Sequence, residues 1–217
     1  MNEVGLPAEV RAVLVSVATP VEVLAGEDVA EQGVEGSIGV VSAGRFAVTV
    51  MAEGSRSRTI ALVQEGDALV MPTEEWQGAP GARVVAATDS EVMVVTGSID
   101  EVVAIDPVAG AWLVRAMAQA VSDRELSAAI ALEPRLERRL ILKLRQLADR
   151  WGRVTPEGVR LDLRVTHQEL ADMVGAARES VTVAFGRLQD QGEIELRRRT
   201  VIIRHMDDQG RTATDTA

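Results

Sequence analysis

Apolar residues along this chain follow two periods, and the change between them predicts where β structure gives way to helices. Between residues 19 and 105, short runs of β-branched residues alternate with glycine-containing turns, about 8–12 residues apart. The runs are Ile38–Val41, Phe46–Val50, Thr59–Val63, Val84–Ala86 and Val92–Val95. No helical pattern separates these runs, so they predict an antiparallel sandwich or small barrel and not a parallel α/β sheet.

The period changes at Asp106-Pro107, a helix cap followed by a proline suited to the first turn. An apolar stripe at helical spacing follows, formed by Ala109, Trp112, Leu113, Ala116, Met117, Ala120 and Val121. The helix could run for about 25 residues, as far as a hinge at Leu132-Glu133 before Pro134. The stripe needs a partner, and we expect the same stripe of a second copy, in a parallel coiled coil. Packing of the stripe on the chain's own β domain is the alternative.

Two short helical patterns lie between Thr166 and Gly192, after a further helix that begins beyond Pro134. The apolar positions are Leu170, Ala171 and Val174 in the first pattern, and Val181, Ala184, Phe185 and Leu188 in the second. Gly175 stands between them, where a tight turn needs a residue that tolerates positive φ. Two helices joined in this way predict a helix-turn-helix, whose second helix enters the major groove of DNA. An ordinary helical hairpin is the alternative.

The sequence around this motif predicts a wing and an entry strand. Glu193–Leu196 and Thr200–Arg204 are β-prone, with three arginines in the turn between them, and Gly158–Val165 alternates as a strand does. Thr166 with Glu169 three residues later forms a capping box. We therefore expect a winged helix-turn-helix over residues 134–206, followed by a disordered tail over 207–217.

Charge agrees with a division of the chain. The net charge is −10 over 217 residues, but residues 1–106 carry 5 Arg and no Lys against 17 Asp and Glu, while residues 135–205 carry 15 Lys and Arg against 10 Asp and Glu. Contact with phosphate needs a locally basic surface and not a basic chain. The sequence has no cysteine, no long apolar run and no signal-peptide pattern, so we expect a cytoplasmic protein with no membrane contact.

The order of these elements resembles the Crp/Fnr family of bacterial transcription regulators. The resemblance is strongest in Thr166–Ala171 and Gly175–Val181, good in Arg138–Gly152, and weaker in Ala25–Glu27 and Glu65–Asp67. It implies an α+β protein with a cyclic-nucleotide-binding-like β-roll (a double-stranded β-helix or jelly roll) over 1–106, a dimerisation helix and hinge over 107–133, and the winged domain. It further implies a homodimer on a pseudo-palindromic DNA operator, with RNA polymerase as a further candidate partner.

The resemblance also implies roles for single residues. Arg178 would donate to a guanine edge, Glu179 would accept from a cytosine amine, and Thr166 and Gln168 would hold phosphates. The third base-reading position is an arginine in the best-known member but Val183 here, which allows contact with a thymine methyl. The full set of expected DNA-binding residues is Thr166, Gln168, Ala177, Arg178, Glu179, Ser180, Thr182, Val183, Arg187, Arg197, Arg198 and Arg199.

The β domain departs from the family's pattern for cyclic-nucleotide binding. Pro80-Gly81-Ala82 stands where the family has Arg-Ser-Ala, and Leu69-Val70 stands near its Gly-Glu pair. The phosphate would therefore lack a cation, unless a local shift brings in Arg83. With no cysteine, and histidines only at 167 and 205, iron–sulfur and haem sensing are also not expected. We thus expect no cofactor and no control by cyclic AMP in the usual mode, with an unidentified small-molecule effector in a divergent pocket as the alternative.

Two other classes of protein, an enzyme and a dimeric adaptor, are alternatives to a DNA-binding regulator. Common catalytic motifs such as GxSxG, Walker A, HExxH and GxGxxG are absent from the sequence, so we do not expect an enzyme. A dimeric adaptor that does not bind DNA is the alternative of another class. The salt dependence of DNA binding separates the two, because counterion release gives a steep slope.

Overall fold

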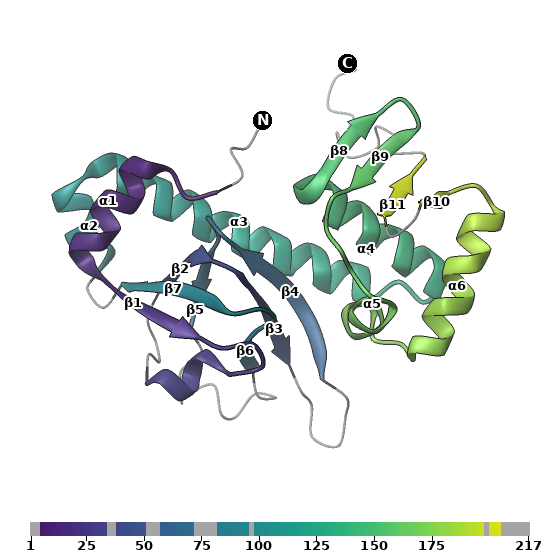
Figure 1. Cartoon of the computed structure of the whole chain (residues 1–217), viewed down its shortest axis with the longest axis horizontal. Helices are drawn as coiled ribbons and strands as arrows, with labels where there is room; N and C mark the ends of the chain where they lie inside the picture. The colour runs from purple at the N-terminus through teal and green to yellow at the C-terminus, as the bar shows by residue number, and fades with distance from the viewer. Residues whose placement is uncertain are drawn as a thin grey trace, which may run out of the picture. The chain divides into compact units, whose positions relative to one another are not determined.

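In the computed structural model, the chain forms two compact units, Met1–Ala128 and Ala129–Ala217 (Figure 1). None of the described helices is long and apolar enough to cross a membrane. The residues that the structure describes are 5–33, 38–50, 57–71, 82–95, 98–197 and 200–204.

Among the described residues of the first unit, seven strands form two antiparallel sheets, in the orders β1-β7-β2-β5 and β4-β3-β6. All five predicted runs are strands, so the antiparallel β-roll is confirmed. The strands are β1 (Ala18–Val23), β2 (Ile38–Ala43), β3 (Arg45–Val50), β4 (Arg58–Gln64), β5 (Ala68–Val70), β6 (Ala82–Ala86) and β7 (Ser90–Val95), with a short 3-10 helix η1 (Val29–Gln32) after β1.

The larger sheet is buried on both faces, which explains why β7 is a continuous apolar run. Val92 and Val94 point into the core between the two sheets, next to Phe46. Met93 and Val95 alternate with them and point to the other face, into a second core under the helices. A strand with only one buried face would have shown alternating polar residues instead.

Three helices cover that second core: α1 (Ala8–Val17), α2 (Ile99–Ile105) and α3 (Pro107–Ala131). Helix α3 has the predicted length of 25 residues, and its N-terminus is capped by Asp106 Oδ1, which accepts from Val108 N at 2.7 Å. Helices α1 and α2 were not predicted. Gly110 allows α2 and α3 to approach closely, because a Cβ there would lie 2.4 Å from Val103 Cγ2.

The apolar stripe of α3 faces its own unit, which corrects the expected dimer interface. Ala109 and Leu113 are buried in the second core, and Trp112, Ala116 and Met117 pack against it. Ala120 is half-buried, and only Val121 is exposed. The stripe therefore has its partner within the chain, which is the alternative interpretation given above.

The opposite face of α3 carries a second apolar line that is exposed. Ala111, Val114, Ala118 and Val121 are spaced by 3, 4 and 3 residues, and Val114 and Val121 are 52% and 53% exposed. We call these four residues the α3 seam. Alternating spacings of 3 and 4 residues are those of positions a and d in a coiled coil.

In the described part of the second unit there are three helices and one four-stranded antiparallel sheet, in the order β10-β11-β9-β8. Figure 1 shows the hairpin of β8 and β9 projecting at one end of the unit. The elements are α4 (Leu136–Trp151), β8 (Gly152–Thr155), β9 (Gly158–Leu161), α5 (His167–Val174), α6 (Arg178–Asp190), β10 (Ile194–Arg197) and β11 (Thr200–Ile203).

This unit agrees with the predicted winged helix-turn-helix, with one addition. Strand β9 is shorter than the predicted strand 158–165, and it pairs on one side with β8, which was not predicted. On its other side β9 pairs with β11, through Arg160 opposite Ile202. The wing of β10 and β11 is thus part of a larger sheet.

Candidate nucleic-acid interface

Helix α5 begins with the predicted capping box. Thr166 Oγ1 accepts from Glu169 N at 3.1 Å, and Glu169 Oε2 accepts from Thr166 N at 2.7 Å. Two backbone N–H groups that the helix cannot satisfy are therefore bonded at this end. The cap fixes where α5 starts, and with it the positions of exposed Thr166 and Gln168, the two expected phosphate ligands.

The turn between α5 and α6 depends on Gly175. Its backbone is left-handed, with φ 64° and ψ 51°, and its N–H bonds to Ala171 O. The two helices meet through their apolar faces, and all the predicted positions are buried: Leu170, Ala171, Val174, Val181, Ala184, Phe185 and Leu188. Because that face is used inside the domain, the remaining face of α6 is presented outward.

The outward face of α6 carries most of the expected base-reading residues. Arg178, Glu179, Ser180, Thr182, Val183 and Arg187 are all exposed, whereas Ala177 is the half-buried N-cap. Among the residues that the structure describes, no ion pair or hydrogen bond engages the Arg178 guanidinium. This cation and the neighbouring carboxylate of Glu179 are thus free to meet an external ligand.

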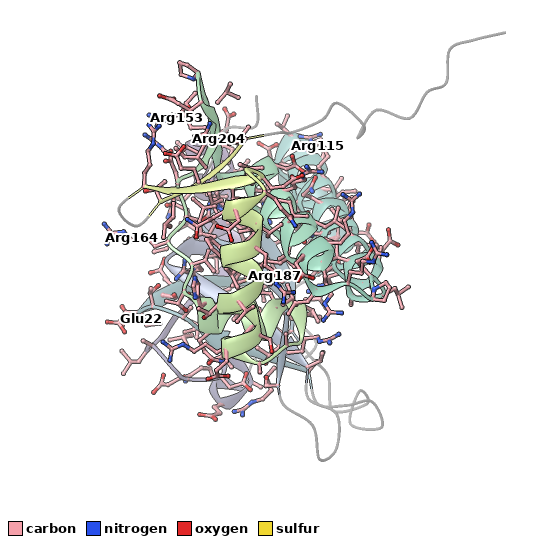
Figure 2. All side chains as sticks on the ribbon, turned by 90° about the vertical axis from the view of Figure 1, so that its right-hand side faces the viewer. Glu22, Arg115, Arg153, Arg164, Arg187 and Arg204 are labelled. Carbon is pink, nitrogen blue, oxygen red and sulfur yellow. The ribbon has the colours of Figure 1, made fainter. Side chains whose placement is uncertain are left out.

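Arg187 has a partner within the domain. Its Nη1 lies 2.5 Å from Glu137 Oε1 on α4, and this hydrogen bond is the main reason why the pKa of Glu137 lies below its ordinary value. The Arg187 side chain is still well exposed, as Figure 2 shows on α6. A phosphate that contacts this guanidinium would share it with Glu137.

The wing is less cationic than its sequence suggested. Arg197 Nε donates to Glu195 Oε1 at 2.5 Å and its Nη1 lies 3.5 Å from Glu157, while Arg204 pairs with the other oxygen of Glu195. Hydrogen bonds from Arg197 and then Arg204 lower the pKa of Glu195. The other two expected arginines, Arg198 and Arg199, lie outside the described residues.

Arg164 is a candidate that the sequence argument missed. It is exposed two residues before the α5 cap, and within the described ranges its guanidinium has no hydrogen bond or ion pair (Figure 2). The signal in the sequence was a basic residue immediately ahead of a helix N-terminus, a place where phosphate is favoured. By contrast, Gln168 is engaged with Asp172, from Nε2 to Oδ1 at 2.8 Å.

Arg83, the cation that a local shift was expected to bring to the phosphate, is already paired in the first unit. Arg83 Nε donates to Asp28 Oδ2 at 2.7 Å, and Asp28 is buried at 5% exposure. Leu69 is buried in the core, so it offers no polar group, and Pro80 and Gly81 lie outside the described residues. No cluster of three or more metal-ligating side chains occurs among the residues described.

Together, the capped α5, the left-handed turn, the outward face of α6 and the adjoining sheet define a winged helix-turn-helix. In agreement, the model of the Crp-like helix-turn-helix domain matches residues 136–208. These residues are therefore a Crp-like helix-turn-helix domain, and the resemblance of the chain to the Crp/Fnr family is confirmed.

Known proteins similar to this chain include a global nitrogen regulator from Synechocystis sp., which is 30% identical over 91 residues. That match spans 40% of this chain and 40% of the relative, less than half of either. A second global nitrogen regulator, from Synechococcus elongatus, is 28% identical over 95 residues, 42% of this chain and 43% of the relative.

Solved structures match over nearly the whole chain. A mutant of CooA from Carboxydothermus hydrogenoformans is 19% identical, covers 95% of this chain and 94% of its own, and has a TM-score of 0.75. The c-di-GMP-responsive global regulator CLP of Xanthomonas campestris is 17% identical over 92% of this chain and 100% of its own, at a TM-score of 0.64. At such identities the structural likeness establishes the fold. The relatives whose descriptions state a role are named as regulators.

Proposed function

We propose that this protein is a transcription regulator that binds a specific, pseudo-palindromic DNA site as a homodimer. The observation that carries the proposal is the outward face of α6, where Arg178 and Glu179 stand exposed at the start of the helix, with no side-chain ion pair or hydrogen bond to any residue that the structure describes. An arginine fits the acceptor edge of guanine and a carboxylate fits the amino group of cytosine in the major groove. The match of residues 136–208 to the Crp-like domain supports the same conclusion.

The α3 seam supports the homodimer. A line of alanine and valine at 3- and 4-residue spacing lies exposed on a 25-residue helix, and the opposite face of that helix is already buried. Exposed apolar residues in a continuous line are typical of an interaction surface. A second copy is the partner we propose, since two seams of this kind can pack against each other in parallel.

Control by cyclic AMP in the usual mode is not part of the proposal. A cyclic phosphate at Arg83 would have to share its guanidinium with Asp28, and drawing the guanidinium away would leave a buried carboxylate without its cation. Isothermal titration with cyclic AMP and cyclic GMP tests this point. Saturable binding at micromolar concentration would favour the alternative of a small-molecule-responsive regulator with a divergent pocket.

DNA binding itself is tested by selection from a random duplex pool, followed by titration of the selected duplex at several salt concentrations. We expect enrichment of a two-fold symmetric sequence with half-sites about one helical turn apart. We also expect the logarithm of the binding constant to fall linearly with the logarithm of salt, by several units per decade. A chain that enriches no sequence and shows a flat salt response would instead be a dimeric adaptor.

A further inference from the structure

The hydroxyl group of Thr182 makes two contacts with other groups of the same domain. Thr182 Oγ1 donates to the carbonyl oxygen of Arg178, one turn earlier in α6, at 3.0 Å. The same oxygen lies 3.0 Å from Nδ1 of His167, on α5. A hydroxyl has a single proton, so with that proton on the Arg178 carbonyl, the imidazole must be the donor in the second contact.

His167 is well placed to keep this arrangement. Both the imidazolium ion and the Nδ1–H tautomer can donate from Nδ1, so the contact does not depend on one protonation state. The ring of His167 lies 5.0 Å from the ring of Phe185, a buried residue of α6. The backbone immediately before His167 is fixed by the Thr166 capping box. The imidazole is thus supported on two sides while it holds the hydroxyl.

With its proton used, the Thr182 hydroxyl has nothing to donate to a base and keeps one acceptor lone pair, so the Cγ2 methyl group is the apolar part that the side chain offers. Thr182 is exposed on the outward face of α6, and the next residue, Val183, is 55% exposed and wholly apolar. One turn further on, Gly186 has no side chain, and a Cβ there would meet open space. The middle of the outward face therefore presents the Thr182 methyl group, Val183 and the bare backbone of Gly186. Charged residues lie on either side of it, Arg178 and Glu179 before it and Arg187 after it.

We propose that Thr182 reads DNA through its methyl group and not through its hydroxyl, and that His167 is the positioning residue that enforces this. Thr182 and Val183 together then form an apolar surface for the 5-methyl group of thymine, the only methyl group on the major-groove edges of the bases. The inference rests on the proposed function and specifies which base chemistry the centre of α6 selects.

A matched pair of variants separates the two parts of the side chain. Thr182→Val keeps a methyl group and removes the hydroxyl, whereas Thr182→Ser keeps the hydroxyl and removes the methyl. On the duplex selected by the full-length wild-type chain, we expect Thr182→Val to bind within about twofold of wild type. We expect Thr182→Ser to bind about 15-fold more weakly, because the dimer loses one buried methyl contact, about fourfold each, in both half-sites. Replacing each thymine singly by uracil should weaken wild-type binding about fourfold at one position per half-site, and Thr182→Ser should no longer respond there.

A second pair tests His167 apart from packing. His167→Phe keeps a ring against Phe185 but cannot donate to Thr182. We expect this variant to lose discrimination between thymine and uracil at that position, and His167→Phe/Thr182→Val to regain it, because valine has no hydroxyl to hold. Thermal unfolding of both variants establishes that they are folded. A general structural role for His167 would not predict rescue by Thr182→Val.

The outcomes separate this inference from the proposed function. If wild type enriches a sequence but binding ignores every thymine-to-uracil replacement, the methyl readout is refuted while DNA binding stands. The same holds if Thr182→Ser matches wild type and Thr182→Val does not, because the hydroxyl would then be the reading group. If wild type enriches no sequence at all, the proposed function fails and this inference fails with it.

Discussion

The Arg83 guanidinium and the buried Asp28 carboxylate join β6 to the start of η1 through a 2.7 Å hydrogen bond. The same contact is the first cause of the raised pKa of Arg83. Asp28 also accepts from Ala30 N at 3.1 Å, which caps η1. Asp28, which lies 55 residues from Arg83 in the sequence, thus already binds the guanidinium that a bound phosphate would use.

Replacement of Arg83 should expose how much this pair stabilises the first unit. Arg83→Gln leaves the buried Asp28 without its cation, and we expect the free energy of unfolding to fall by about 1–2 kcal/mol, since the arginine itself is half exposed. Urea unfolding measures the loss, and hydrogen exchange in β6 and η1 locates it. The matched control is Glu31→Gln, because Glu31 is exposed and lies 3.8 Å from Arg83. Equal effects of the two variants would contradict the special role of Asp28.

Arg178→Ala should weaken binding to the selected duplex by about 1–3 kcal/mol and relax the preference at one base pair. The reason is that its exposed guanidinium has no partner within the described part of the domain. Gel-shift titration against duplexes changed at each position gives both quantities. Gln189→Ala, an exposed polar residue further along α6, serves as the control and should change neither. Unchanged affinity of Arg178→Ala would rule out guanine recognition by this residue.

Arg164→Ala should reduce affinity uniformly across DNA sequences, because a contact with phosphate carries no information about the base. We expect the slope of log affinity against log salt to become shallower by about two units, because the dimer loses one phosphate contact from each of its two Arg164 residues. Arg160 is the control, since it already donates to Asp162 at 2.8 Å. Equal changes of slope in Arg160→Ala and Arg164→Ala would contradict the assignment of a phosphate contact to the unpaired guanidinium of Arg164.

Charge placed on the α3 seam should prevent dimerisation. Val114→Asp and Val121→Asp put a carboxylate on a line of apolar residues that are exposed in the single chain, so each variant should fold yet sediment as a monomer. Val108→Asp changes a valine of α3 that is even more exposed but is not one of the four seam residues, and this variant should remain dimeric. Sedimentation equilibrium of the three variants provides the measurement. Loss of the dimer in Val108→Asp alone would place the interface elsewhere.

Acid should weaken the connection between α4 and α6. The hydrogen bond from Arg187 lowers the pKa of Glu137 below its model-compound value of 4.5. A group whose pKa is depressed by folding adds stability above its unfolded pKa, and the stability is lost as pH falls through the folded pKa. Wild type should therefore exceed Glu137→Gln in stability at pH 7, with the difference shrinking below pH 4.5. A difference that is constant with pH in chemical unfolding would contradict this assignment.

Much of the DNA-binding unit could be predicted because its signals are local. The capping box spans residues 166 to 169, the turn depends on one glycine, and the apolar faces of α5 and α6 repeat within two turns of helix. The five strand runs of the first unit are equally local, since β-branched residues favour strands wherever they cluster. The hairpin partner β8 and helices α1 and α2 were missed, because their sequences carry weaker periodic signals of their own.

The sequence by itself determined helices α3, α4, α5 and α6 and the five strand runs of the first unit, because a hydrophobic period reflects the geometry of one element. It also determined that α3 has an apolar stripe. Only the tertiary structure decided that this stripe belongs to the chain's own core and that the α3 seam lies opposite. Tertiary structure likewise decided the pairs Arg83–Asp28, Arg187–Glu137 and His167–Thr182. Their partners are 55, 50 and 15 residues apart, so no period within a single element encodes them.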